Sequence, residues 1–169
     1  MKKHILVCAL LFTSSFLFAQ SDFKAFHFGL GGTFSLPVGT LKDNAPYGAG
    51  FELQASYLVS DHVETFLQSG VNVFKGRTDY ASDYSILHVP IVAGARYKLG
   101  DETGFFAGAG LGYGIFKSSY NDASAVNGFL YSPQIGYDFG KGEILFNYTA
   151  TAATGGTLSY IGIKLFRKF

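Results

Sequence analysis

The sequence has a single cysteine, Cys8, and it lies within an apolar stretch near the start of the chain. A lipoprotein would need this cysteine at its cleavage site, behind a longer apolar stretch, so a lipid-anchored form is disfavoured. Once the leader described below is removed, no cysteine remains. This excludes disulfides and thiolate chemistry from the mature protein.

Charge is also scarce, and no long apolar run follows the leader. Charged residues make up 15% of the sequence, against about 25% in typical soluble proteins. The 13 basic residues include Lys2 and Lys3 of the leader, so 11 basic side chains remain against 12 acidic ones. Neither sign dominates, which gives no reason to expect a nucleic-acid partner. The abundant residues are 22 glycines, 18 phenylalanines and 11 tyrosines, a composition that favours β-structure with one face against lipid.

The first 19 residues have the layout of a secretory signal peptide. A short basic start, residues 1–4, precedes an apolar stretch at 5–18, and Ala19 supplies a small residue at a cleavage point. The stretch is too short to span a bilayer as a helix. We therefore expect a cleaved signal peptide at 1–19 and one domain at 20–169.

The remaining sequence alternates between apolar and polar residues with a period of two. Between Tyr47 and Val59, for example, Phe51 and Leu53 alternate with Glu52 and Gln54. In a strand these two sets point to opposite faces. The pattern recurs in eight segments: 26–36, 47–59, 63–75, 87–99, 105–115, 129–139, 144–151 and 157–167. Most are close to the ~9–11 residues that a tilted strand needs to cross a bilayer.

The connections alternate between short and long. Three are tight turns, at 60–62, 100–103 and 140–142, whereas 37–46, 76–85 and 118–128 are longer and 153–156 is again short. Short turns on one rim and longer loops on the other are typical of outer-membrane barrels. The sequence therefore predicts an all-β fold, an eight-stranded antiparallel up-and-down transmembrane β-barrel.

Three tyrosines support this register. Tyr57, Tyr97 and Tyr137 are spaced 40 residues apart, each just before a tight turn. A repeat of two strands explains the spacing and puts the three rings at one height, as an interfacial aromatic girdle requires.

The two faces of the predicted strands indicate which side meets lipid. The face carrying charge is otherwise rich in glycine, while the opposite face is apolar and would form a band larger than a soluble monomer tolerates. Charges must then line the interior, where they need partners. We expect a lumen charge cluster in which Glu52 and Glu64 pair with Arg96, Lys98 or Lys164.

The alternating strands, Ala19-Gln20 at the end of the leader and the run from Tyr84 to Tyr97 together resemble the outer-membrane β-barrel domain proteins of the Bacteroidota. These are a loose relative of the small OmpA/OmpX type of barrel. The resemblance spans the mature chain and implies fold and an outer-membrane location, with outer-membrane lipid and lipopolysaccharide as partners. The last strand, ending in Phe169, resembles the signal read by the barrel-assembly machinery, although Arg167 departs from that pattern.

Candidate chemistry is sparse, and we assign no catalytic, cofactor-binding or metal-binding residue. His88, with Ser85 nearby, could belong to a lipid-modifying enzyme, but no second loop histidine accompanies it. His27 and His62 have no ligand partner at metal spacing. The alternating glycines from Gly108 to Gly114 do not open a helix, so we interpret them as room for side chains from across the barrel.

The sequence favours a monomeric, porin-like but non-enzymatic outer-membrane barrel with a structural or surface-interaction role. The interior of an eight-stranded barrel is about filled by its own side chains, which makes an open pore unfavourable. A narrow channel or small-ligand-binding barrel is the first alternative, followed by a lipid-modifying enzyme and a soluble lipid-binding calyx.

Overall fold

A computed structural model describes residues 26–77, 84–100, 103–120 and 124–169. The expected signal peptide, 1–19, lies outside the described residues.

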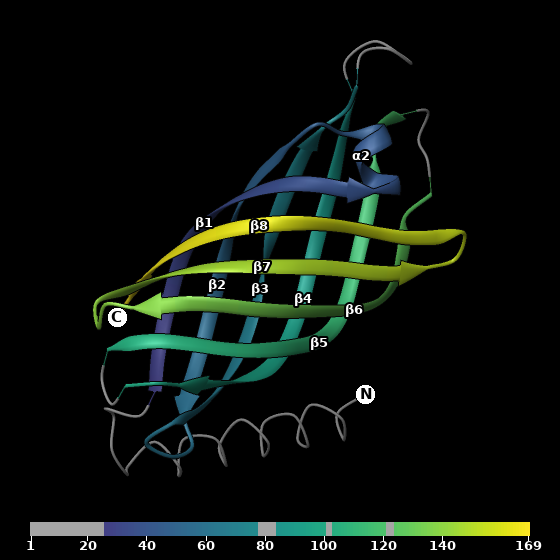
Figure 1. The fold of residues 1–169 in the computed structure, drawn as a ribbon. Helices are drawn as coiled ribbons and strands as arrows, with labels where there is room; N and C mark the ends of the chain where they lie inside the picture. The colour runs from purple at the N-terminus through teal and green to yellow at the C-terminus, as the bar shows by residue number, and fades with distance from the viewer. Residues whose placement is uncertain (1–25, 78–83, 101–102, 121–123) are drawn as a thin grey trace, which may run out of the picture.

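Eight strands and one short helix are the regular elements of the described residues, arranged as in Figure 1. In chain order they are β1 (Phe26–Gly39), α2 (Thr40–Asn44), β2 (Gly48–Leu58), β3 (Val63–Lys75), β4 (Ser85–Lys98), β5 (Gly104–Ser118), β6 (Val126–Asp138), β7 (Gly142–Ala153) and β8 (Gly156–Lys168). Each strand pairs antiparallel with the next, and β8 pairs with β1 to close the barrel. The predicted fold class is therefore confirmed.

Closure depends on the pairing of the first and last strands. The ladder between them runs from Gly29 opposite Lys168 to Gly39 opposite Leu158. Phe169 extends it, since its N–H donates to the carbonyl of Phe28 at 2.8 Å. Every strand thus has two neighbours, so the sheet has no unpaired edge.

The two faces of the sheet differ sharply in exposure. Phe51 is 74% exposed and Leu53 63%, whereas Glu52 between them is 1% exposed. The same contrast holds on β4, where Ile91 faces outward and Arg96 is buried. The apolar face is therefore the outer surface and the polar face lines the lumen, as the alternation predicted.

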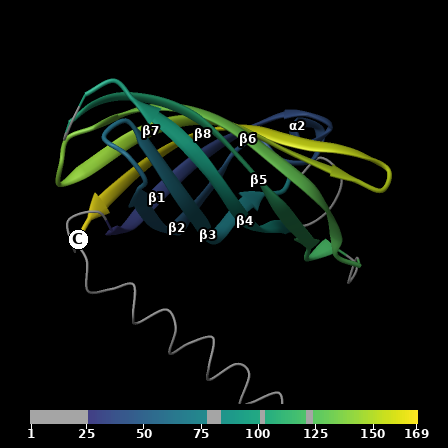
Figure 2. The ribbon, with the colours of Figure 1, turned by 90° about the horizontal axis from the view of Figure 1, so that it is seen from below.

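The barrel has two unlike ends, which we call the turn end and the loop end. The turn end carries the tight turns after β2, β4 and β6, together with Phe26 and Phe169. The loop end carries α2, which lies at the opposite end of the barrel from the C-terminus (Figure 2). The longer connection predicted at 37–46 is therefore partly wrong, because residues 37–39 belong to β1 and Thr40–Asn44 form α2. No helix in the described part of the chain is long and apolar enough to cross a membrane.

Inward-facing glycines let bulky neighbours fill the narrow lumen. At Gly108 an added Cβ would lie 2.6 Å from the Cβ of Arg96 on the adjacent strand, which is closer than real Cβ atoms approach. At Gly32, on the outer face of β1, the corresponding position meets no atom within 4 Å. A glycine is therefore required at position 108, whereas position 32 has room for a side chain.

We expect the substitution Gly108→Val to lower the free energy of unfolding by about 1–3 kcal/mol, because the new side chain must displace Arg96 or the backbone. Gly32→Val is the matched control, and we expect it to be neutral or stabilising because valine favours strands and has room there. Reversible unfolding in denaturant, with the protein in lipid vesicles, measures both. Equal losses for the two variants would contradict the steric explanation.

Candidate functional site

The lumen of the described barrel holds eight buried side chains of Asp, Glu, Lys and Arg, four acidic and four basic. They are Glu52, Glu64, Asp138, Glu143, Arg96, Lys98, Lys164 and Lys168. Their formal charges cancel, and every one of them is engaged in an ion pair. The interior is polar but electrically balanced, which limits the cost of burying charge.

Arg96 is the centre of the largest group. Its Nε donates to Glu64 Oε2 at 2.7 Å, and Nη1 and Nη2 donate to the two carboxylate oxygens of Glu143, both at 2.9 Å. The Phe106 ring lies 4.4 Å from the guanidinium carbon, adding a cation–π contact. Because β4 and β7 are not neighbours in the sheet, the bidentate pair with Glu143 connects strands across the lumen.

Amide side chains continue this network toward the middle of the barrel. Gln54 Nε2 donates to Glu143 Oε1 at 2.9 Å, and Gln68 Nε2 donates to Gln54 Oε1. In a further group, Lys164 Nζ lies 2.5 Å from Glu52 Oε2, and Asn72 donates to the other oxygen of Glu52 at 3.0 Å. Neutral donors thus occupy carboxylate lone pairs that the cations leave free.

A separate group closes the turn end. Asp138 Oδ2 accepts from Lys98 at 3.0 Å and from Lys168 at 2.6 Å. Its other oxygen, Oδ1, accepts from the N–H of Gly140, which has a φ of 83° in the turn after β6. The side chain of Asp138 therefore fixes the turn and pairs two interior lysines at once.

The lumen charge cluster expected from the sequence comprises Glu52, Glu64, Arg96, Lys98 and Lys164. All five of its members are buried in the lumen, and the structure brings Glu52 to Lys164 and Glu64 to Arg96. Lys98 instead pairs with Asp138. Glu143 and Lys168 are further pairing partners beyond those expected from the sequence, although both follow the inward alternation of their strands.

An aromatic layer closes the lumen nearer the loop end. The His88 ring stacks on Phe116 with centroids 4.0 Å apart, and Phe74 and Tyr160 flank the pair. His88 is fully buried, and neither of its ring nitrogens has a hydrogen-bond partner among the described residues. Leu41 of α2 packs onto this layer from the loop end. The layer and the Arg96 group thus block the lumen at two levels.

The tempting pair of His88 and Ser85 does not form a catalytic arrangement. Ser85 starts β4 at the rim, where its N–H donates to Ser119 Oγ at 2.9 Å. His88 lies deeper and contacts aromatic rings. Among the described residues, no three His, Cys, Asp or Glu side chains are grouped to hold a metal ion.

The three tyrosines of the expected girdle face outward near the turn end. Tyr57 and Tyr97 are exposed, and Tyr137 is half-buried. The Tyr97 ring stacks on His62, 5.6 Å away, and Tyr137 contacts Phe105 edge-on at 4.9 Å. Tyr97 and Tyr137 therefore each lie against another ring at the turn end.

No protein-family model matches the chain, and no curated protein matches it. Solved structures do share its fold. Ail, the attachment invasion locus protein of Yersinia pestis, solved with the heparin analogue sucrose octasulfate, has a TM-score of 0.55 and 12% identity over 86% of this chain and 97% of its own. Neisserial surface protein A has a TM-score of 0.54 and 11% identity, covering 85% and 97%. OprG, an outer membrane protein of Pseudomonas aeruginosa, has a TM-score of 0.51 and 11% identity, covering 86% and 96%.

These neighbours are small eight-stranded outer-membrane barrels. At such low identity the likeness concerns the fold, and it covers nearly the whole of each neighbour.

We expect Arg96→Met to lower the free energy of unfolding by about 3–5 kcal/mol, because it leaves the carboxylates of Glu64 and Glu143 buried without their cation. Adding Glu64→Gln and Glu143→Gln to the same chain should restore much of the loss, since the unpaired charges are then gone. Denaturant unfolding of the vesicle-bound protein measures each step.

The matched control is Lys117→Met, which removes an exposed cation on β5; we expect a change within about 0.5 kcal/mol. If Arg96→Met and Lys117→Met have the same small effect, the ion-pair network does not stabilise the barrel.

Proposed function

We propose that this protein is a bacterial outer-membrane barrel, of the type found in the Bacteroidota, with a structural or surface-interaction role. It acts as a monomer whose lumen neither conducts nor catalyses. The observation that carries the proposal is the combination of an apolar outer surface with a lumen blocked at two levels.

The outer surface supports a membrane location. Large apolar side chains are exposed on all eight strands, among them Phe34, Leu53, Leu67, Ile91, Leu111, Ile135, Phe146 and Leu165. In water such a continuous band would be a strong aggregation liability, whereas lipid chains solvate it without penalty. The closed ladder from β1 to β8 meets the further requirement that every strand be paired within the hydrocarbon. In this setting Tyr57, Tyr97 and Tyr137 serve as the interfacial girdle.

The blocked lumen argues against a pore. The Arg96 group spans the interior from β3 and β4 to β7 near the turn end, and the His88–Phe116 layer fills it near the loop end. A solute passing through would have to separate paired charges in one layer and packed rings in the other. The burial of His88 away from Ser85 likewise argues against a lipid-modifying enzyme.

The expected partners follow from the same location. Outer-membrane lipid and lipopolysaccharide contact the apolar band, and the barrel-assembly machinery reads the last strand. Phe169 is suited to this second role because its side chain is 72% exposed on the outer face while its backbone pairs with Phe28.

The membrane location predicts how lysine is tolerated on the outer surface. Leu53→Lys, in the middle of β2, should lower the free energy of unfolding in bilayers by ~2–4 kcal/mol, whereas Leu99→Lys, just beyond the turn end of β4, should cost ~0–1 kcal/mol. Both leucines are exposed, at 63% and 71%. The native protein should also fractionate with outer membranes and migrate differently in gels before and after heating. Equal tolerance at the two positions, or recovery in the soluble periplasmic fraction, would refute the membrane assignment.

The closed lumen predicts no conduction. In planar bilayers we expect no steady current steps from the folded protein, and in liposomes no sugar-driven swelling above that of protein-free vesicles. Insertion is verified by the heat-dependent gel shift in the same samples. Reproducible current steps that scale with the amount of folded protein would favour the narrow-channel alternative.

A further inference from the structure

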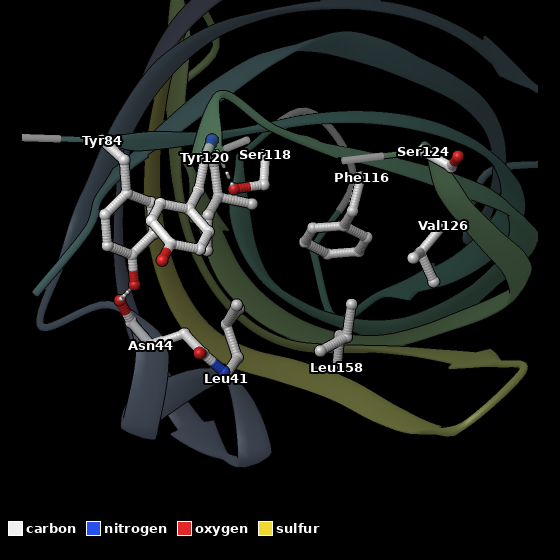
Figure 3. A pocket seen from close by; sticks show the side chains of 10 residues that line it. Leu41, Asn44, Tyr84, Phe116, Ser118, Tyr120, Ser124, Val126 and Leu158 are labelled. Atoms are coloured by element: carbon white, nitrogen blue, oxygen red, sulfur yellow. Dashed lines mark hydrogen bonds between the residues drawn. The ribbon is translucent and has the colours of Figure 1, made fainter. Parts of the chain in front are cut away.

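A pocket of about 490 Å³ opens at the loop end, above the aromatic layer (Figure 3). Its apolar floor and walls include Leu41 from α2, Ile86 from β4, Phe116 from β5 and Leu158 from β8. This size lies within the range of about 300–1,000 Å³ that small-molecule sites occupy. The pocket ends at Phe116, whose ring stacks on His88, so it is a blind cavity rather than the entrance to a channel.

Hydrogen bonds between different segments hold one wall of the pocket in place. The carbonyl oxygen of Asn44, at the end of α2, accepts from Tyr84 Oη at 2.7 Å and from the N–H of Arg77 at 3.0 Å. The Tyr84 ring in turn packs against Tyr120 with centroids 5.7 Å apart. These contacts join the segments before β2, after β3, before β4 and after β5. The wall is therefore formed before any ligand arrives, which reduces the entropic cost of binding.

The lining specifies a kind of ligand. No described residue that lines the pocket is Asp, Glu, Lys, Arg or His. Its polar side chains are all neutral and belong to Asn44, Tyr84, Ser118, Tyr120 and Ser124. A charged molecule would lose its hydration here without gaining a counter-charge. A neutral molecule could bury an apolar body against Phe116 and Leu158 and direct a hydroxyl or carbonyl to the rim.

We propose that the loop-end pocket is a binding site for a neutral, mostly apolar small molecule that carries one hydrogen-bonding group and enters from the aqueous side. The site goes beyond the structural role proposed above and does not depend on how the barrel contributes to the membrane. An acyl chain of a neighbouring lipid has similar chemistry, and the test below separates the two sources.

Naphthol serves as the probe, because it has an apolar two-ring body and one hydroxyl. We expect it to shift amide NMR signals of Leu41, Phe116 and Leu158 saturably in the folded protein in lipid nanodiscs. Naphthalenesulfonate has the same rings and a negative charge. We expect its affinity to be lower by a factor of about ten or more, since the pocket offers no counter-charge.

Two substitutions on neighbouring residues of β8 test the location. Leu158→Trp fills the pocket from its wall and should weaken naphthol binding about tenfold or more, equivalent to about 1.4 kcal/mol. Thr157→Trp adds the same side chain on the exposed outer face and should leave binding unchanged. Val126→Trp, on β6 and also lining the pocket, is a second blocking variant in case Leu158→Trp does not fold.

Three results would overturn the proposal. The first is a set of shifts that never saturate and spread over the outer surface, which would indicate partition into lipid. The second is equal binding by the Leu158→Trp and Thr157→Trp proteins. The third comes from nanodiscs whose lipids carry a nitroxide at the chain end: broadening of the Phe116 signal by that lipid, together with no naphthol binding, would assign the pocket to an acyl chain.

Discussion

The pairing of β8 with β1 is the constraint on which the rest of the structure depends. It removes the last unpaired backbone groups, and only a sheet without an edge can present a continuous apolar surface to hydrocarbon. Closing a sheet of eight strands also fixes the size of the interior, which leaves space for side chains but little else. Phe51 and Glu52, adjacent in sequence, therefore lie on opposite faces of the sheet, one exposed on the outer surface and one buried in the lumen.

Because the barrel is closed, the side chains that line its lumen must fit the available volume as well as satisfy one another's charges and hydrogen bonds. Bulky groups such as Arg96 and Phe106 fill it where glycines on adjacent strands leave room, and the buried charges are ion-paired and balance only over the lumen as a whole. The lumen therefore has two regions of different composition. Ion pairs and amides occupy the part toward the turn end, and rings occupy the part toward the loop end, where a blind apolar pocket remains above them.

The sequence predicted the strands and their faces because alternation is a local property. Leu53 and Gln54 are neighbours in a strand, so their side chains must point to opposite faces. It did not predict α2, whose five residues are too few to show a helical period. Parity placed Glu64 and Arg96 in the lumen and put them within reach of each other. It could not identify Glu143 as the second partner of Arg96, because that contact spans strands that share no hydrogen bonds and depends on the tilt and stagger of the whole barrel. The pocket was equally hidden, since its walls come from four separate segments.

The bidentate pair between Arg96 and Glu143 has a consequence for the divergence of this protein over time. Losing Arg96 alone would leave the buried Glu143 carboxylate without its cation, and losing Glu143 alone would leave Nη1 and Nη2 of Arg96 without their acceptor, so substitutions at the two positions are expected to arise together in related sequences. Because their strands are not neighbours, such joint changes would not belong to the pattern that sheet pairing imposes. Paired substitutions at these positions would therefore identify a contact across the lumen, and so constrain the width of the barrel, from sequences alone.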